Sequence, residues 1–231
     1  MTRMFGTLSA RATLVATAVA VVALAGGVAH ADARGEAVLA RARATERAQL
    51  AALAGTTLRM QTRGTLRNGK ATHTIEAMRH LGVALDGTIH NDFVWGKIDG
   101  QLTDESGLRA ASGAPKKRAG QAESLTVALA PLTGGGVDVK PIGPTQGGYL
   151  LRCDVRRDAA VGRIDLIVDE ATGKKRSASL HPAGTLVKLA DRAEMELVYA
   201  DDGTPAMLRS AFAARILWVD RAAEMVTAPL R

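Results

Sequence analysis

The chain is poor in aromatic residues and in cysteine. Phe, Trp and Tyr make up 3% of its 231 residues, and Cys153 is the single cysteine. One thiol cannot form an internal disulfide, so the stability of the fold must come from packing. Few aromatic side chains and scattered basic residues also argue against a nucleic-acid groove, in which aromatic side chains stack on bases.

Long apolar runs are missing except near the N-terminus. The basic segment Met1 to Arg11 contains no acidic residue, and the apolar segment Ala12 to Val28 follows it. These are features of a secretory signal peptide, and Ala29-His30-Ala31 provides the small residues of a cleavage site. We therefore expect cleavage before Asp32 and export to the periplasm as a soluble protein. The alternative is an uncleaved membrane anchor, because the apolar run approaches the roughly 20 residues that span a bilayer.

The rest of the chain, residues 32–231, is predicted to form a single domain. About 200 residues suffice for one sizeable core. No later segment is apolar enough to predict a transmembrane span after signal cleavage. Loss of residues 1–31 removes two arginines and no acid, so the net charge falls from +7 to +5.

Motifs of the common enzyme classes are also missing. The sequence contains no HExxH zinc motif and no Gly-x-Ser-x-Gly elbow, and no glycine cluster lies in the strand–GxxxxGK–helix order of a phosphate loop. Cys153 lies in a strand-like run and is interpreted as a small buried hydrophobic residue. His73, on an apolar strand face, is interpreted as a core histidine. We expect no catalytic residue, no metal ligand and no cofactor.

Residues Asp32 to Ala54 are predicted to form a helix. Asp32 is a candidate N-cap, and Gly55 is placed just beyond the C-terminus of the helix. The apolar residues of this segment fall on one stripe, which comprises Val38, Leu39, Ala42, Leu50 and Leu53. The helix is therefore expected to lie against a sheet.

A β-hairpin after this helix has the strongest local pattern. Thr57 to Arg67 alternates between apolar or small residues and polar residues, and Asn68-Gly69 is a typical two-residue turn. That turn pairs Arg67 with Lys70 and makes Arg63 and Glu76 diagonal neighbours. The apolar face of the hairpin then comprises Leu58, Met60 and Leu66 on one strand and Ala71, His73, Ile75 and Ala77 on the other.

Short strand-like runs separated by turns fill most of the remaining chain. Short turns are typical of antiparallel strands, so the fold class is α+β and mainly β. Gly107 to Ala122 is predicted to be a mobile loop, and Ser124 to Leu132 a short helix. The predicted strands are residues 82–85, 88–98, 137–140, 149–155, 163–168, 174–180, 185–189 and 193–199, with one or two closing strands in 207–225.

This order of features resembles the LolA/LolB-like superfamily of periplasmic lipoprotein-sorting and lipid-carrier domains. The resemblance rests on the predicted signal peptide and helix, on the strand pair around Arg63-Gly64-Thr65-Leu66, and on three turn segments. These segments are Ile98-Asp99-Gly100, Val168 to Lys174 and Tyr199 to Pro205. The resemblance implies a strongly curved antiparallel sheet, an incomplete barrel, with an N-terminal helix and short capping helices. It also implies an arginine that latches the lid helices, which corresponds to Arg63 or Arg59.

The leading functional hypothesis is a carrier or binding protein that shelters an acyl chain of a lipid or lipoprotein in an apolar half-barrel cavity. An envelope protein is the candidate acceptor. Small and flexible aliphatic side chains favour a hollow face, while an ordinary packed core fits the same pattern. The second hypothesis is an envelope sensor or interaction domain of the same fold, with a filled cavity, and the third is a small secreted hydrolase that uses Cys153 or a histidine. The predicted cavity-lining residues are Leu39, Leu50, Leu58, Met60, Leu66, Ile75 and Ala77.

Overall fold

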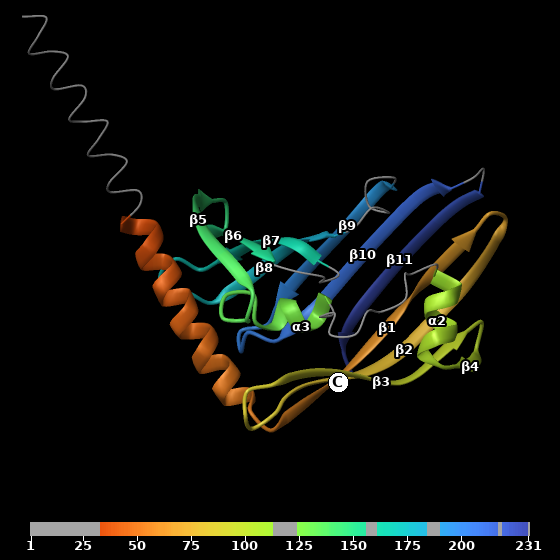
Figure 1. The fold of residues 1–231 in the computed structure, drawn as a ribbon, viewed down its shortest axis with the longest axis horizontal. Coiled ribbons are helices and arrows are strands. Elements are labelled where there is room, and N and C mark those ends of the chain that lie inside the picture. Colours follow the sequence, from red (N-terminus) through yellow and green to blue (C-terminus); the bar gives the residue numbers. More distant parts are fainter. Residues whose placement is uncertain (1–32, 113–123, 156–160, 184–189, 217–218, 231) are drawn as a thin grey trace, which may run out of the picture.

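A single open sheet organises the protein. The computed structural model describes residues 33–112, 124–155, 161–183, 190–216 and 219–230. In these residues eleven antiparallel strands form one sheet in the order β4-β3-β2-β1-β11-β10-β9-β8-β7-β6-β5 (Figure 1). The strands β4 and β5 lie at the two opposite edges, and all neighbouring strands are consecutive in the chain except β1 and β11. This one junction brings the N-terminal hairpin beside the C-terminal hairpin.

The strands and helices have the following bounds. The strands are β1 Thr56–Asn68, β2 Ala71–Val83, β3 Ile89–Ile98, β4 Gln101–Thr103, β5 Val137–Thr145, β6 Gly148–Val155, β7 Val161–Val168, β8 Lys175–Pro182, β9 Ala190–Tyr199, β10 Pro205–Ile216 and β11 Val219–Pro229. The N-terminal helix covers residues 33–53, and two short helices follow, α2 Glu105–Ser112 and α3 Ser124–Leu129.

The predicted strong curvature of the sheet is wrong. The sheet is neither closed nor strongly curled, although it is mainly β and carries the expected N-terminal helix (Figure 1). Its two edge strands are poor partners for closure. β4 has only three residues, and β5 contains Pro141 and Pro144, which lack the N–H that a neighbouring strand would need. A register irregularity between Pro141 and Gly143 interrupts that edge further.

The β1–β2 hairpin forms with the predicted faces but with a shifted register. Arg67 pairs with Thr72 instead of Lys70, and Arg63 lies directly opposite Glu76, with 3.7 Å between Arg63 Nε and Glu76 Oε1. The Asn-Gly turn requires positive φ at both residues. Gly69 has a φ of 62°, but Asn68 remains in β1 and is not among the described residues of positive φ. The shift of two residues leaves every side chain on its predicted face.

Several other predictions are confirmed. The ambiguous stretch at 207–225 contains most of β10 and of β11, and α3 covers much of the predicted helix at 124–132. The predicted strand at 185–189 lies outside the described residues, as do the signal peptide and the Asp32 cap. The prediction of a loop from Gly107 is wrong for residues 107–112, which belong to the helix α2, and residues 113–122 lie outside the described residues. The Asp104 carboxylate caps α2 by accepting a hydrogen bond from the Gly107 N–H at 2.7 Å.

The hydrophobic core lies on one face of the sheet, which we call the inner face. There the core joins buried residues of the N-terminal helix and α3 to those of β5 to β9, and also to Met60 of β1, Leu81 and Val83 of β2, and Leu208 of β10. Val38, Leu39 and Ala42 of the helix are buried against it. Leu151, Ile164, Leu166 and Leu197 of the sheet have no exposed surface. The predicted apolar stripe of the helix thus faces the sheet.

Candidate functional site

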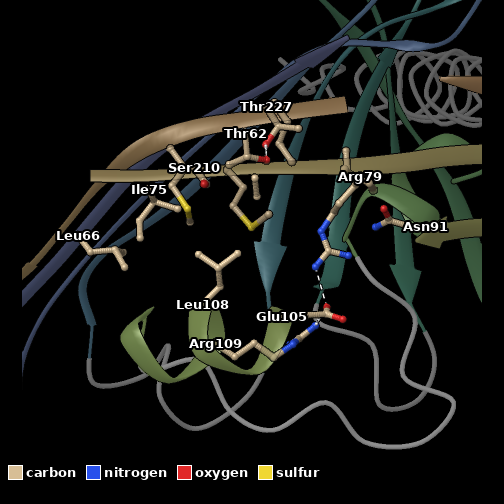
Figure 2. Close-up of a pocket in the computed structure, with 15 residues that line it drawn as sticks. Thr62, Leu66, Ile75, Arg79, Asn91, Glu105, Leu108, Arg109, Ser210 and Thr227 are labelled. Atoms are coloured by element: carbon tan, nitrogen blue, oxygen red, sulfur yellow. Dashed lines mark hydrogen bonds and ion pairs between the residues drawn. The ribbon is translucent and has the colours of Figure 1, made fainter. Parts of the chain in front are cut away.

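A cavity lies on the inner face, beside this core. It has a volume of about 350 Å³ and lies between α2 and the hairpins β1–β2 and β10–β11 (Figure 2). Most of its wall is aliphatic or thioether: Leu66, Ile75, Ala77, Leu108, Leu125, Met195, Leu208 and Met225. The volume is within the range of about 300–1,000 Å³ that small-molecule sites occupy.

Small side chains on β1 and β2 help to keep this part of the inner face hollow. Gly64 lies on the inner face between Thr62 and Leu66, and the backbone of β11 approaches it closely. A Cβ atom at Gly64 would be 2.1 Å from the Glu224 carbonyl oxygen, so the close pairing of β1 and β11 requires glycine. Ala77 on β2 is also short. The hollow therefore follows from residue size as well as from the small extent of α2.

A charged cluster at one end of the cavity joins the sheet to α2. Arg79 Nη2 of β2 and Arg109 Nη2 of α2 lie 2.7 Å and 2.9 Å from Glu105 Oε1 (Figure 2). The Arg79 guanidinium is also 5.6 Å from the ring centroid of Phe93. Burial alone would raise the pKa of Glu105, but the hydrogen bonds and charges of the two arginines outweigh it and lower that pKa. Glu105 is therefore charged at neutral pH and holds α2 over the cavity.

The predicted lining residues divide between the cavity and the core. Leu66, Ile75 and Ala77 line the cavity. Leu39 and Met60 are buried in the packed core instead, and Leu50 and Leu58 pack against it. The cavity thus lies farther along the β1–β2 hairpin, away from the N-terminal helix, than the sequence predicted.

The two arginines predicted to latch a lid lie on the other face. Strict alternation along β1 places Arg59 and Arg63 opposite to Met60, and both are exposed. Arg63 pairs with Glu76 of β2. Arg79, which sequence reasoning missed, makes the ion pair from sheet to helix. Its signal was available, because an arginine between Ala77 and Leu81 occupies an inward position of β2.

Cys153 and His73 differ in their surroundings. Cys153 has no exposed surface, and burial raises the pKa of its thiol to about 12, so the thiolate is not accessible at neutral pH. The interpretation of His73 as a core histidine is wrong. Its ring is partly exposed, and Nδ1 lies 2.7 Å from Asp99 Oδ2, in the turn that joins β3 and β4. The pKa of Asp99 is lowered by the hydrogen bonds from His73 and from the Thr74 N–H. The His73–Asp99 pair therefore attaches the β3–β4 turn to β2.

A buried ion pair that the sequence did not reveal fixes the N-terminal helix. Glu46 Oε2 lies 3.4 Å from Lys175 Nζ, and both side chains are almost completely buried. Glu46 Oε1 accepts hydrogen bonds from the N–H groups of Leu132 and Thr133 and from the Thr133 hydroxyl. Lys175 Nζ donates to the Leu129 carbonyl at 2.6 Å. Burial lowers the pKa of Lys175, against the opposing effect of Glu46. The pair connects the helix, α3 and β8.

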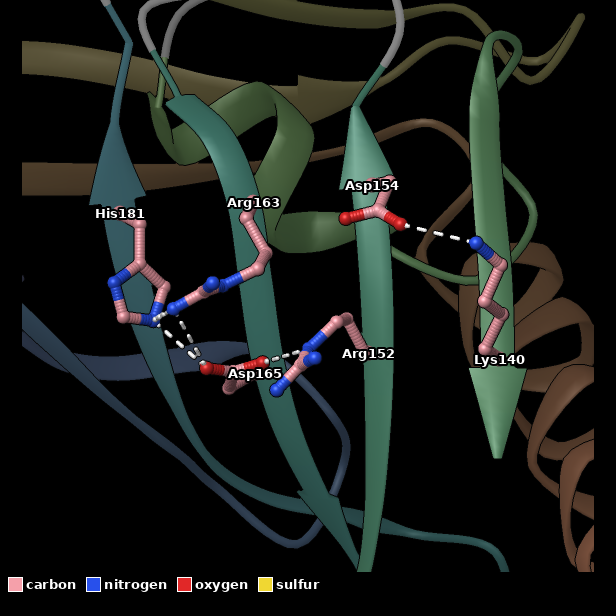
Figure 3. Close-up of polar contacts among 6 residues, drawn as sticks. All are labelled: Lys140, Arg152, Asp154, Arg163, Asp165 and His181. Carbon is pink, nitrogen blue, oxygen red and sulfur yellow. Dashed lines mark hydrogen bonds and ion pairs between the residues drawn. The ribbon is translucent and has the colours of Figure 1, made fainter. Parts of the chain in front are cut away.

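A second polar cluster lies on the outer face of β5 to β8 (Figure 3). Asp165 Oδ2 lies 2.8 Å from His181 Nε2 and 3.4 Å from Arg163 Nη2, while Oδ1 accepts a hydrogen bond from Arg152 Nε at 3.1 Å. Burial acts to raise the pKa of Asp165, but these partners lower it overall. Cross-strand pairs of this kind stabilise a solvated sheet face. The described residues contain no group of three or more His, Cys, Asp or Glu side chains that could hold a metal ion.

Comparison with known proteins adds little to this geometry. The comparisons with protein-family models and with curated proteins gave no match. One chain of the complex structure of Pseudomonas aeruginosa MucA/MucB is 12% identical, with a TM-score of 0.20, over 85% of this chain and 94% of that chain. A chain of the crystal structure of MucB in complex with MucA(peri) is 11% identical, with a TM-score of 0.18, over 84% and 93%. TM-scores this low carry no inference, so the resemblance to the LolA/LolB-like superfamily stays a prediction.

Among the residues that the structure describes, no helix combines the length and the apolar character that crossing a bilayer requires.

Proposed function

We propose that the protein is an exported binding protein whose cavity takes one acyl chain of a lipid or lipoprotein. The observation that carries the proposal is the cavity itself, about 350 Å³ in volume and walled mainly by Leu, Ile and Met side chains. Each methylene group that moves from water into such a site contributes about 0.8 kcal/mol. The volume lies near the lower end of known ligand sites, which suits one chain rather than a whole two-chain lipid.

Movement of α2 widens the access of an acyl chain to the cavity. The helix contributes Leu108 to the wall of the cavity and is attached to β2 through Glu105 and Arg79. Displacement of α2 breaks this ion pair and exposes Leu66 and Ile75, and an acyl chain in the cavity compensates by covering them. Export is part of the proposal and is supported by the signal-like sequence of residues 1–31.

The test is titration with a dansyl-labelled fatty acid whose fluorescence rises in apolar surroundings. We expect saturable binding, weakened at least tenfold by Ala77→Phe, because the ring occupies the cavity. The matched control is Ala211→Phe, which makes the same change on the outer face of β10. Absence of binding to the wild-type protein, or equal binding by the two variants, would rule out the cavity as the site.

Binding of a partner protein is the second candidate function. The observation that favours it is the short pairing of β4, which in the described chain extends only over Gly96, Lys97 and Ile98 of β3. Exposed apolar side chains lie nearby, with Val94 on β3 and Leu102 on β4. An extended segment can bind such an edge by adding a strand. The test places a photo-crosslinking amino acid at Val94 in exporting cells. Products no different from those of the same amino acid at Arg47, on the exposed side of the N-terminal helix, would exclude the edge.

A further inference from the structure

The outer face of the central strands has no helix upon it in the described chain. The N-terminal helix and α3 pack on the inner face, where α2 and α3 also line the cavity. On the outer face, β1, β11, β10 and β9 present two adjacent rows of side chains that run across the strands. The register of the sheet defines both rows.

One row is largely apolar and the other carries charge. In the apolar row the register gives the order Gln61, Ala228, Met207, Val198 across β1, β11, β10 and β9. Val198 is 42% exposed, which is high for a valine within a sheet. In the adjacent row the register gives the order Arg63, Val226, Arg209, Glu196, and all four are exposed. These eight residues are called the outer patch.

The order of charges in the outer patch is self-complementary. A two-fold axis parallel to the strands, between β11 and β10, places Arg63 opposite Glu196 of a second copy and Val226 opposite Arg209 of that copy. The same axis places Gln61 opposite Val198 and Ala228 opposite Met207, so the apolar rows also meet. An axis along β11 would instead set Arg63 against Arg209, and like charges in contact are strongly unfavourable. Within the outer patch the charges therefore favour the first axis, which sets Arg67 opposite Arg192 of the second copy two rows farther along the strands.

We propose that two copies of the protein associate through their outer patches, face to face, about this axis. Sheets pack about 10 Å apart with strand directions within about 30° of each other, and a two-fold axis along the strands produces such an alignment. The patch borders a hollow of about 520 Å³ that Arg63, Glu196, Arg209 and Val226 line together with their neighbours. The hollow leaves room for Arg209 of the second copy.

Edge-to-edge association is disfavoured by the same structure. The prolines of β5 and the three residues of β4 make both edges poor templates for a second sheet. A bilayer surface complements the patch less well, because a membrane of one charge sign would attract the arginines and repel Glu196. The outer patch does not contribute to the cavity, so the dimer and the proposed ligand are independent claims.

The test is sedimentation velocity of the exported protein over a range of concentrations. We expect a monomer–dimer equilibrium that Arg63→Glu or Glu196→Arg weakens, each by on the order of tenfold, because every dimer contains two such pairs. The double variant Arg63→Glu/Glu196→Arg restores the opposite charges and is expected to recover most of the affinity. Arg47→Glu, on the exposed side of the N-terminal helix, is the matched control and leaves the equilibrium unchanged.

Several results would overturn the proposal. The first is a protein that stays monomeric at every concentration. The second is a dimer whose affinity neither charge reversal changes. The third is a loss of affinity in the single variants that the double variant does not restore. Binding of the monomer to phosphatidylglycerol vesicles, lost in Arg63→Glu, would assign the patch to a membrane instead. Circular dichroism confirms that each variant is folded, and Val198→Lys provides a second disruption of the same interface that does not depend on the ion pairs.

Discussion

The inner face of the sheet has two parts that differ in how they are covered. On β6 and β7, Leu151, Ile164 and Leu166 have no exposed surface and belong to the core with the N-terminal helix and α3. On β1 and β2, Leu66 and Ile75 border a cavity of about 350 Å³ under the eight-residue helix α2. Both parts have the same alternation of apolar side chains. Helices that pack on the inner face, more than the alternation of side chains along the strands, therefore decide which part of the face forms a core and which part borders a cavity.

The two parts also differ in how their helices are attached. The N-terminal helix is fixed by the buried pair of Glu46 and Lys175, whereas α2 is attached through Glu105 and Arg79, which are partly exposed. Partly exposed ion pairs contribute little to stability, about 0–1 kcal/mol. Loss of one partner from a buried pair costs much more. The packed part is therefore expected to be rigid, and α2 is expected to be the element that opens.

The largest effect is expected from Lys175→Met in the packed part. It leaves the Glu46 carboxylate buried without its cation, which costs about 3–5 kcal/mol in the free energy of unfolding. Urea denaturation measures the loss. The double variant Glu46→Gln/Lys175→Met removes both charges and is expected to lose less than the single variant. A loss below about 1 kcal/mol for the single variant would contradict the buried pair.

Matched leucine truncations compare the two parts directly. Leu151→Ala is expected to cost about 2–5 kcal/mol, because it creates a void in a filled region. Leu66→Ala enlarges an existing cavity and removes fewer contacts, so its cost falls at or below the lower end of that range. Equal losses in urea denaturation would show that the region around Leu66 is packed as tightly as the core.

Enlargement of an alanine is also expected to destabilise the packed part more than the part that borders the cavity. Ala178→Leu on β8 forces a larger side chain between Leu166 and Leu197, its cross-strand neighbours, and is expected to cost about 1–3 kcal/mol. Ala77→Leu extends into the cavity and should leave the free energy of unfolding nearly unchanged. Thermal unfolding of the two variants measures the difference. An equal destabilisation by Ala77→Leu would mean that the cavity cannot accept added atoms.

The smallest effect is expected from Asp165 on the outer face. Its pKa is lowered in the folded protein, so it contributes stability above the pKa of the unfolded chain, about 3.9. That stability is lost as the pH falls through the lower, folded pKa. Asp165→Asn should therefore flatten the decline in the urea midpoint below about pH 4. An unchanged pH dependence in Asp165→Asn would show that the cluster with Arg152 and His181 does not stabilise the sheet.

The sequence predicted the helix, the strands and the strand faces, which depend on the local pattern of apolar residues. Alternation placed Leu66, Ile75 and Ala77 on the inner face, and a register error of two residues did not matter, because side chains alternate with a period of two. The N-terminal helix, most of the strands and the closing strands at 207–225 were predicted for the same local reasons.

Features that depend on distant residues were not predictable in this way. The position of the cavity depends on which strands the helices cover. The burial of Lys175 depends on Glu46, which lies far away in the chain. The strong curvature of the sheet was expected only from the family resemblance, and the two edge strands that leave the sheet open lie far apart in space. Arg79, at an inward position of β2, is a local sequence signal of the charged cluster.

Native mass spectrometry, with lipid extraction, tests the central claim most directly. The protein is purified from the periplasm of an exporting cell without added lipid, beside its Ala77→Phe and Ala211→Phe variants. Our account predicts near-stoichiometric acyl lipid on the wild type and on Ala211→Phe, and little on Ala77→Phe. A ligand-free mass for the wild type that does not change when lipid is added would contradict it and would favour the partner-binding function.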